Sequence, residues 1–392
     1  MKVSIVGQGY VGLPLAIAAA IVGGHSVVGI DTNRKIVETL KNQKSPIRDI
    51  ADSQIEVAWK SNHYQVADNF DSVQDSDVVI ICVPTPLDAS QRPDLTYLEA
   101  AVESVASNLK SGALVVLEST VSPGTTRNVV AKKLDKNGIH YELAYSPERI
   151  DPANKKWNVI NTPKLVAGIS VKATKQALNF YKTFIEEVIL GSSVEVIETA
   201  KLLENSFRLI NISFINEIAE FCSKLEIDVR EVIGAAATKP YGFMPFYPGA
   251  GVGGHCIPVD PSYLSSRAKE IGAGTRFIDL ANDVNRSLPA YFAGVASRIL
   301  GALKGKNIVL VGIAYKSDVS DMRETPASGL IRELRSAGAK VFWHDELVGV
   351  WMNEKSVPLT NKYDLAILVN PHTGTDLSNL GQVPILDTRG GY

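Results

Sequence analysis

Cysteine is scarce in this sequence. The 392 residues include only three cysteines, Cys82, Cys222 and Cys256, which are odd in number and far apart. A disulfide framework is therefore not expected, and a reducing cytoplasm is the expected location. Long apolar runs are missing too, since none approaches the roughly 20 residues needed to cross a bilayer. The first apolar run begins at Val3, so we expect neither a membrane-spanning helix nor a signal peptide.

An excess of charge of one sign is also absent. The chain has 40 Lys and Arg against 42 Asp and Glu, a formal net charge of −2. We therefore expect neither nucleic acid nor a membrane surface as a partner. With 45% hydrophobic and 21% charged residues, the composition is that of a folded protein, and the length predicts two or three domains.

Short apolar runs alternate with helix-like stretches in the first half of the chain. The runs are β-rich and bounded by turn residues: Val3–Gly7, Ser26–Asp31, Asp77–Val83, Ala113–Glu118 and Tyr141–Ala144. Amphipathic stretches such as 13–22 and 95–109 lie between them. This alternation predicts a doubly wound parallel sheet.

The rest of the chain is first helical and then α/β again. A segment without Pro or Gly, from Glu198 to about Leu225, predicts one long helix, and a Gly- and aromatic-rich loop and more helix follow. A strand–helix–strand pattern begins at Asn307. We expect an α/β fold with two doubly wound parallel-sheet domains, residues 1–196 and 304–392, joined by a central helical segment, residues 197–303.

A glycine-rich turn follows the first strand. Gly7-Gln8-Gly9-Tyr10-Val11-Gly12 has the spacing G-x-G-x-x-G, in which the glycines permit a tight turn, close approach of a pyrophosphate and helix–strand packing. Asp31 ends the next strand, where a carboxylate would bind a ribose 2′-hydroxyl and repel a 2′-phosphate. NAD is therefore favoured over NADP, although Arg34 softens that preference. A glycine turn in an unrelated α/β protein is the alternative.

Two threonines follow later strands. Thr85 lies in Val83-Pro84-Thr85-Pro86 and Thr120 in Glu118-Ser119-Thr120-Val121. Ligands of open α/β sheets bind outside the carboxyl ends of the strands. Both threonines are candidate cofactor or substrate contacts, and ordinary strand-end turns are the alternative.

Cys256 lies between glycines and a proline, in Gly253-Gly254-His255-Cys256-Ile257-Pro258. Such a loop allows backbone to approach a ligand, so Cys256 is a candidate nucleophile, whereas Cys82 and Cys222 fit small core positions. On the long helix, Lys201, Asn205 and Arg208 share one face by their spacing. That polar stripe suits an anionic or oxygen-rich ligand, and a solvated helix face is the alternative.

Seven blocks in this order resemble the UDP-glucose/GDP-mannose dehydrogenase family. They are Gly7–Gly12, Val83–Pro86, Glu118–Gly124, Ser146–Arg149, Lys201–Arg208, Gly253–Asp260 and Tyr315–Pro326. The stretches 146–154 and 239–249 look most like the UDP-N-acetylglucosamine 6-dehydrogenase branch. The resemblance implies a Rossmann-like NAD domain, a central helical dimerisation segment and a Rossmann-like UDP-binding domain.

The resemblance also implies roles for individual residues. The catalytic residues would be Cys256 as the nucleophile, with Lys201, Asp260, Asn205, Glu148 and Thr120. The cofactor contacts would be Gly7, Gly9, Tyr10, Val11, Gly12, Asp31, Arg34, Thr85, Thr120 and Arg323. The substrate contacts would be Arg149, Lys201, Asn205, Arg208, Tyr247, Gly253, Tyr315, Lys316 and Arg389. It implies no metal, and it leaves open whether Lys239 reaches across a dimer.

The reaction that these residues suit is a four-electron oxidation of the C6 hydroxyl of a UDP-sugar to an acid. Cys256 would form a thiohemiacetal and then a thioester, and NAD would be the cofactor. UDP-N-acetylglucosamine leads among the substrates, followed by its N-acetylmannosamine and N-acetylgalactosamine isomers and by UDP-glucose. A single-step hydroxyacid dehydrogenase and an inactive nucleotide-sugar binding protein are the rival functions.

Overall fold

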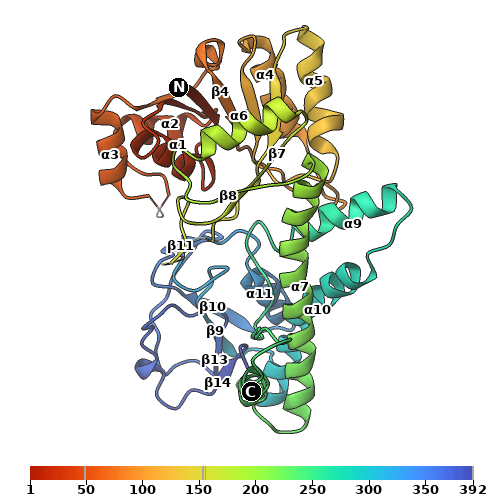
Figure 1. Cartoon of the computed structure of the whole chain (residues 1–392). Coiled ribbons are helices and arrows are strands. Elements are labelled where there is room, and N and C mark those ends of the chain that lie inside the picture. Colours follow the sequence, from red (N-terminus) through yellow and green to blue (C-terminus); the bar gives the residue numbers. More distant parts are fainter. Residues whose placement is uncertain (48–49, 152–153, 155, 391–392) are drawn as a thin grey trace. The chain divides into compact units, whose positions relative to one another are not determined.

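The computed structural model describes residues 1–47, 50–151, 154 and 156–390, and the chain divides into two units, Met1–Leu203 and Glu204–Tyr392. Pro152 and Ala153, within the block 146–154, lie outside the described residues. Figure 1 shows both units and labels their elements. Among the described residues no helix combines the length and apolar character that crossing a membrane requires.

The first unit is built on one eight-stranded sheet in the order β3-β2-β1-β4-β5-β6-β7-β8. The strands are β1 (Lys2–Val6), β2 (Ser26–Ile30), β3 (Tyr64–Ala67), β4 (Val78–Ile81), β5 (Leu114–Leu117), β6 (Glu142–Tyr145), β7 (Lys164–Gly168) and β8 (Val188–Leu190). All neighbours pair in parallel except β6 and β7, which are antiparallel. The predicted parallel sheet is present, with one reversal near its edge.

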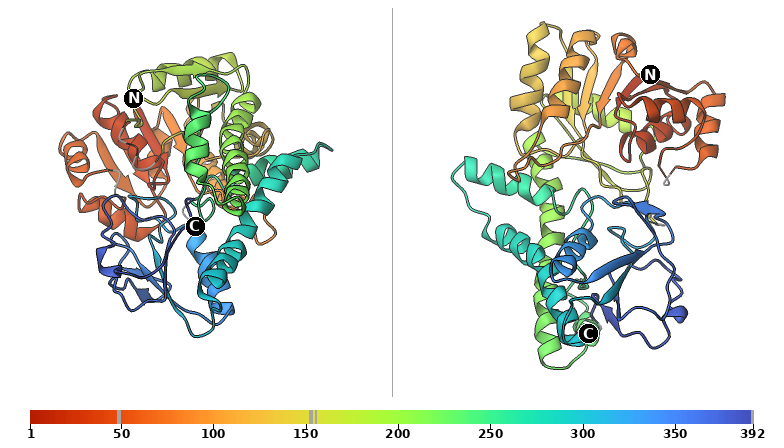
Figure 2. Two further views of the ribbon diagram at one scale, coloured as in Figure 1. Left: turned by 90° about the horizontal axis from the view of Figure 1, so that it is seen from below. Right: turned by 180° about the vertical axis from the view of Figure 1, so that it is seen from behind.

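Successive strand residues of this unit face opposite cores. Val3 and Ile5 pack with α1 (Gly12–Ile21), α2 (Arg34–Lys41), α3 (Asp52–Lys60) and α6 (Val171–Tyr181). Val6 packs with α4 (Thr96–Asn108), the π-helix η2 (Thr126–Ala131), α5 (Lys132–Leu134) and the start of α7 (Val194–Lys224). Figure 2 shows these helices from two further sides. Helices therefore cover both faces, which is why the strands read as nearly continuous apolar runs.

The second unit carries a four-stranded parallel sheet in the order β10-β9-β13-β14. Its strands are β9 (Asn307–Val311), β10 (Lys340–His344), β13 (Leu365–Leu368) and β14 (Ile385–Asp387). Helices α10 (Arg276–Leu300) and α11 (Pro326–Ser336) cover one face, and loop residues with the 3-10 helix η4 (Ser378–Leu380) cover the other. A hairpin of β11 (Val350–Trp351) and β12 (Glu354–Lys355) follows β10.

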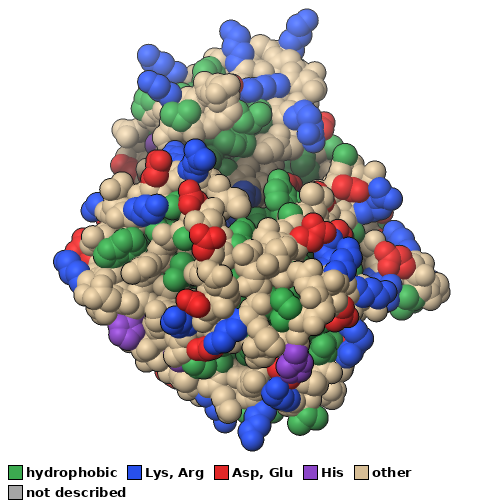
Figure 3. Space-filling model, turned by 90° about the horizontal axis from the view of Figure 1, so that it is seen from above, with side chains coloured by type: hydrophobic (Ala, Val, Ile, Leu, Met, Phe, Trp, Pro, Cys, Tyr) green, Lys and Arg blue, Asp and Glu red, His purple; other side chains and the backbone are tan. Residues whose placement is uncertain are grey.

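Three further helices bear on the candidate site. Helix α7 continues into the second unit, as the uninterrupted pattern from Glu198 to Leu225 predicts. Helix α8 (Val229–Ala237) comes next, and α9 (Asp260–Glu270) starts just after the Cys256 loop. Together with α10 they form the helical part of the second unit. Both basic and acidic side chains lie on the face seen in Figure 3.

Candidate active site

In the first unit, the predicted site residues gather at one edge of the sheet. Because β1, β2, β4, β5 and β6 run in parallel, their carboxyl ends share that edge. The segments that follow these strands carry the residues in question: Gly7, Asp31, Thr85, Thr120 and Glu148. Ligands of open α/β sheets bind at this edge. The structure therefore places these five residues where a ligand is expected.

The glycine turn meets the steric demands of a dinucleotide fingerprint. Gly7 has a φ of +92°, and a Cβ there would lie 2.5 Å from the Cys82 carbonyl oxygen. A Cβ on Gly12, the first residue of α1, would overlap the Gly7 carbonyl oxygen. Gly9 differs, because a Cβ there meets nothing within 4 Å among the described residues. Gly7 and Gly12 thus close the turn, and Gly9 leaves its open side clear for a ligand.

Asp31 is tied directly to this turn. One carboxylate oxygen accepts the Gln8 backbone N–H at 2.8 Å, and the other accepts that of Asn33 at 2.8 Å. Tyr10 and Val11 continue the turn between Gly9 and α1, and the exposed Arg34 opens α2 just after Asp31. The predicted ribose-binding carboxylate and the phosphate-binding turn are therefore adjacent in the first unit.

The two predicted threonines are in contact. The Thr85 hydroxyl donates a hydrogen bond to the Thr120 carbonyl oxygen at 2.8 Å. Beside them, the Ser119 hydroxyl donates to the Val83 carbonyl oxygen at 2.7 Å. These bonds join the segments after β4 and β5, so the two threonines occupy one region rather than two separate turns.

Glu148 and Arg149 are held by the segment after β6. One Glu148 carboxylate oxygen accepts the backbone N–H groups of Arg149 and Ile150, both at 2.6 Å. The other oxygen lies 3.7 Å from the Lys164 ammonium nitrogen. The Arg149 guanidinium donates to the Pro163 carbonyl oxygen at 2.8 Å. The Glu148 carboxylate is thus oriented through both of its oxygens.

In the second unit, the loop that carries Cys256 is fixed at several points. Asn216 of α7 accepts the Gly249 N–H at 3.0 Å, and Asn285 of α10 accepts the Val252 N–H at 2.8 Å. The Gly254 N–H donates to the Arg323 carbonyl oxygen at 3.0 Å. Two backbone N–H groups, those of Val259 and Asp260, donate to the Cys256 carbonyl oxygen at 3.1 and 2.8 Å. The Cys256 backbone is therefore held at the start of α9.

This loop packs closely on residues after β9. A Cβ on Gly253 would lie 2.9 Å from the Tyr315 Cβ and 2.8 Å from the Glu324 carbonyl oxygen. Gly254 has a φ of +83°, and its Cβ would lie 2.9 Å from the Tyr315 ring. Only glycine fits at these two positions. The contact brings the predicted nucleophile loop next to the predicted substrate residue Tyr315.

The polar residues of α7 divide between the units. Lys201 belongs to the first unit, and Asn205 and Arg208 belong to the second. The Asn205 amide donates to the Asp260 carboxylate at 2.5 Å, so two predicted catalytic residues meet, while Arg208 is exposed. All three residues lie on α7, as predicted. Asn205 is the one that hydrogen-bonds Asp260, and Arg208 faces solvent.

Two of the predicted arginines, Arg323 and Arg389, each pair with an aspartate two residues earlier. Arg323 hydrogen-bonds Asp321 through its Nε at 2.9 Å, and Arg389 hydrogen-bonds Asp387 through its Nε at 2.8 Å. Arg230 of α8 also donates to Asp387 at 2.9 Å. Burial raises the pKa of Asp387, but the hydrogen bonds from the two arginines outweigh it and the net pKa is lowered. Asp321 and Asp387 therefore hold the guanidinium groups of Arg323 and Arg389 in place.

Lys316 lies in a loop that a buried aspartate and a histidine hold in place. Asp345, after β10, accepts the N–H groups of Ile313 and Ala314 at 2.9 and 3.3 Å, and His372 Nε2 at 2.9 Å. His372 Nδ1 accepts the Asp318 N–H at 2.8 Å, which makes Nε2 the protonated nitrogen. With Glu346 this group could offer metal ligands. Because the ring nitrogens and the Asp345 oxygens are all hydrogen-bonded, however, it reads as a loop anchor.

Two predicted residues lie at the surface of the second unit. Tyr247 is 59% exposed, and the Lys239 ammonium lies 5.1 Å from the centre of the Tyr241 ring. Neither residue takes part in the contacts of the Cys256 loop described above. Tyr247 as a substrate contact and Lys239 as a residue that crosses a dimer stay predictions.

Several residues that hold the site were not identified from the sequence. The buried Glu198 accepts the N–H groups of Gly124 and Thr126 at 2.6 and 2.8 Å and so ties α7 to the segment after β5. Burial raises its pKa. Asn216, Asn285 and the His372 anchor were missed as well. A carboxylate three residues before Lys201, on its face of α7, was the available indication for Glu198.

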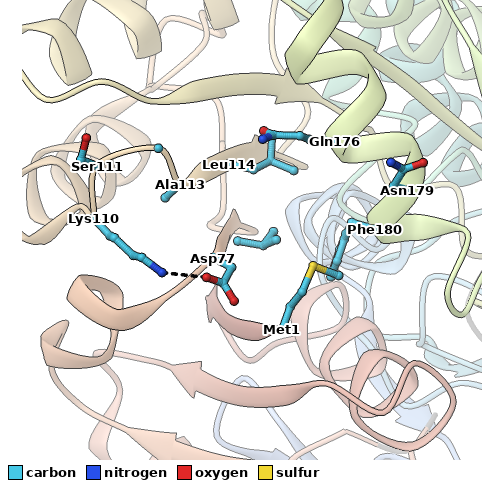
Figure 4. A pocket seen from close by; sticks show the side chains of 11 residues that line it. Met1, Asp77, Lys110, Ser111, Ala113, Leu114, Gln176, Asn179 and Phe180 are labelled. Atoms are coloured by element: carbon cyan, nitrogen blue, oxygen red, sulfur yellow. Dashed lines mark hydrogen bonds and ion pairs between the residues drawn. The ribbon is translucent and has the colours of Figure 1, made fainter.

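A hollow of about 370 Å³ lies at the opposite edge of the first unit's sheet. Figure 4 shows residues that precede β1, β4 and β5, among them Met1 and Asp77, with Lys110 paired to Asp77 at 2.7 Å. These are the amino ends of the strands, whereas ligands of such sheets bind at the carboxyl ends. The hollow is therefore separate from the Gly7–Gly12 turn, which lies at the carboxyl end of β1.

Comparisons with known proteins agree with this layout. Models of the UDP-glucose/GDP-mannose dehydrogenase family match throughout: the NAD binding domain at residues 1–185, the central domain at 195–287 and the UDP binding domain at 309–389. The chain is 34% identical over 401 residues to UDP-N-acetyl-D-glucosamine 6-dehydrogenase of Pseudomonas aeruginosa, covering 97% of this chain and 92% of that relative.

Two archaeal proteins are also similar. UDP-N-acetyl-D-mannosamine dehydrogenase of Pyrococcus horikoshii is 34% identical over 361 residues, covering 89% of this chain and 84% of the relative. The structure of a UDP-glucose dehydrogenase from Pyrobaculum islandicum matches with a TM-score of 0.92 at 26% identity, covering 99% of this chain and 94% of that one. With all three domain models matched in order, the chain belongs to the UDP-glucose/GDP-mannose dehydrogenase family of oxidoreductases, and NAD is its cofactor.

Proposed function

We propose that this enzyme oxidises the C6 hydroxyl of a UDP-sugar to a carboxylate in two steps, with UDP-N-acetylglucosamine or one of its isomers as the substrate. The observation that carries the proposal is the Cys256 loop, whose glycines allow it to pack on Tyr315 beside the UDP-binding sheet. A cysteine fixed beside a nucleotide-binding loop suits covalent capture of an aldehyde.

The cofactor residues form a cradle of the right kind in the first unit. Gly7 and Gly12 close the turn, Gly9 leaves its side open, and the Asp31 carboxylate lies beside it. We assign the pyrophosphate to the turn and the start of α1, and the ribose hydroxyls to Asp31. Bound NAD supplies the acceptor for the hydride removed in each oxidation. Tyr10, Val11, Arg34, Thr85, Thr120 and Arg323 complete the assigned contacts.

The protein side chains then have defined tasks. A base removes the proton of the C6 hydroxyl, and the Cys256 thiolate attacks the aldehyde to form a thiohemiacetal. After the second oxidation, water attacks the thioester carbon, the C–S bond breaks, and the sulfur leaves as the thiolate. We assign proton transfer from that water to Glu148 with Thr120, and stabilisation of the oxyanion to Lys201 and Asn205.

Asp260 orients the Asn205 amide, and the arginines assigned to the substrate supply positive charge to bind it. Asp260 fixes the Asn205 amide through their 2.5 Å hydrogen bond, so the amide has one orientation during catalysis. We assign the UDP moiety to Tyr315, Lys316 and Arg389, and the remaining substrate contacts to Arg149, Arg208, Tyr247 and Gly253. Guanidinium groups suit diphosphate because they donate two parallel hydrogen bonds.

The stoichiometry of NADH tests this function. We expect two NADH per sugar consumed when limiting UDP-N-acetylglucosamine, its two isomers and UDP-glucose are each carried to completion with excess NAD and absorbance is read at about 340 nm, because each oxidation delivers one hydride. The best panel member names the substrate. One NADH per sugar would remove the thioester step and favour a single-step dehydrogenase. Binding without NADH from folded protein would favour a sugar-binding protein.

We also propose that a second copy of the chain covers the exposed face of α7. Phe207, Phe214 and Phe221 are spaced by seven residues and are 46%, 57% and 58% exposed. Residues seven apart lie on one side of a helix. A stripe of three exposed phenylalanines is costly in water, and a symmetric contact between two α7 helices would bury it.

Replacing Phe214 and Phe221 by Asp tests this assembly. The wild type is expected to sediment with twice the mass of the chain, and the double variant with the mass of one chain, because charge on the stripe prevents its burial. Val171→Asp, at an 88% exposed position of α6, is the matched control and should sediment as the wild type does. A wild type that sediments as one chain, or a double variant that stays paired, would contradict the dimer.

We further propose the cytoplasm as the location. Cys82, Cys222 and Cys256 are all described, and all three are thiols. The proposed chemistry needs Cys256 as a thiolate, and a reducing compartment maintains it.

A further inference from the structure

A group of charged side chains is buried within the first unit, under the carboxyl edge of its sheet. Glu118 follows β5, Lys164 begins β7 and Tyr181 ends α6, and their exposed fractions are 1%, 6% and 0%. The Lys164 ammonium lies 3.0 Å from one Glu118 oxygen, and the Tyr181 hydroxyl donates to the other at 2.5 Å. The ammonium also lies 5.1 Å from the centre of the Tyr181 ring.

A contribution to folding stability does not by itself explain why these charged side chains are buried. Taking ions out of water costs several kcal/mol each, so a buried pair is often no better than apolar residues of the same size. Burial lowers the pKa of Lys164, but the charges of Glu118 and Glu148 outweigh it and the net pKa is raised. Burial raises the pKa of Glu118 to about 6, while Lys164 opposes that rise. The ammonium charge is thus held in the interior.

That charge faces Glu148. One Glu148 oxygen accepts two backbone N–H groups, and the other lies 3.7 Å from the Lys164 nitrogen. A small cavity of about 10 Å³ adjoins them, lined by Glu148, Lys164 and Thr162 among others. The buried Thr162 hydroxyl has no hydrogen-bond partner among the described residues. A volume of about 10 Å³ is at the lower limit of the space that one water molecule needs.

We propose that Lys164 is a positioning residue for thioester hydrolysis, which holds the Glu148 carboxylate in place, while Glu118 and Tyr181 hold the Lys164 ammonium. This rests on the role of Glu148 in the proposed function. In the step concerned, water forms a C–O bond to the acyl carbon, the C–S bond breaks and Glu148 takes the water proton. In this proposal Lys164 acts on the hydrolytic step through its contact with Glu148.

The test compares Lys164→Met with Lys164→Arg in the full chain, with NAD and the best UDP-sugar of the panel. For Lys164→Met we expect kcat for acid formation to fall about 10- to 100-fold, with both KM values within about threefold of wild type. A sugar adduct on Cys256 should accumulate, visible by intact mass, because hydrolysis slows after the thioester forms. Glu148→Gln should show the same phenotype, and Lys164→Arg should restore most of kcat.

Two further variants separate a positioning role from a structural one. Lys172→Met removes a lysine that pairs with Glu142 at 3.0 Å with 60% of its side chain exposed, and it should behave as wild type. If Lys164→Met does not fold, Tyr181→Phe decides, because it removes only the hydrogen bond to Glu118. Adduct accumulation in Tyr181→Phe supports the proposal, and wild-type kinetics overturns it.

The outcomes also distinguish this inference from the proposed function. Wild-type enzyme that yields one NADH per sugar would overturn the function, whatever Lys164 does. Wild-type enzyme that yields two, beside a folded Lys164→Met variant that turns over normally without an adduct, would overturn the role of Lys164 alone. A loss of kcat that equals the loss of titrated NAD sites would show that Lys164 is merely structural.

Discussion

Cys256→Ser is expected to abolish steady-state acid formation, with a loss of at least about a thousandfold in kcat. A cysteine thiolate attacks carbonyl carbon readily, whereas a serine hydroxyl stays protonated at neutral pH and needs a base of its own. The substitution should leave the loop conformation unchanged, because the backbone N–H groups of Val259 and Asp260 hold the Cys256 carbonyl oxygen. Stopped-flow absorbance and product analysis measure both oxidations.

Cys222→Ala is the matched control for this variant. Cys222 is 2% exposed and packs with Ile215 and Ala219 of α7, so its loss removes a sulfur from the core of the same unit and no group from the proposed chemistry. We expect turnover close to wild type. Acid released at the wild-type rate by Cys256→Ser would rule out covalent catalysis, while at most one NADH per site without acid would support it.

The second large effect is a difference in stability between alanine variants at two glycines of the Gly7–Gly12 turn. Gly12→Ala places a Cβ on the Gly7 carbonyl oxygen and 3.3 Å from the Cys82 Cβ, so the turn must open. We expect the free energy of unfolding of this variant to fall by at least about 3 kcal/mol. Gly9→Ala meets no atom within 4 Å among the described residues, so its free energy of unfolding should stay within about 0.5 kcal/mol of wild type.

The affinity for NAD should nevertheless be lower in Gly9→Ala than in the wild type. The added methyl group occupies the space through which backbone approaches the pyrophosphate, so we expect the Kd for NAD to rise at least about tenfold, or about 1.4 kcal/mol. Urea unfolding and calorimetric titration of NAD measure the two effects separately. Gly9→Ala that is as stable as wild type and binds NAD equally well would show that the pyrophosphate lies elsewhere.

Most of the architecture could be predicted because it depends on local periodicity. Runs such as Val3–Gly7 and Asn307–Val311 are apolar because both faces of a parallel strand are buried. The unbroken segment from Glu198 to Leu225 became α7 because nothing in it stops a helix. The segments that escaped prediction are short or weakly patterned, such as the eight-residue α2 and the three-residue β8.

The reversal between β6 and β7 escaped for another reason. Strand direction leaves no mark on the apolar pattern of a buried strand, so the antiparallel pairing of β6 and β7 could not be predicted from that pattern. Lys164, the first residue of β7, is buried by its contact with Glu118, which is 46 residues away in the chain. Its burial therefore could not be predicted from the run Lys164–Gly168 alone.

Some features of the candidate site could be predicted from the sequence, and others could not. The glycine spacing, Asp31 at the end of the second strand and Cys256 within its glycine loop are local features, so the sequence alone determined the cofactor turn and the candidate nucleophile. Only the tertiary structure decided which polar groups meet. Glu118 and Lys164 are 46 residues apart, and Glu198 and Gly124 are 74 apart. Pairs at such separations are made by the packing of whole elements, which no periodicity along the chain encodes.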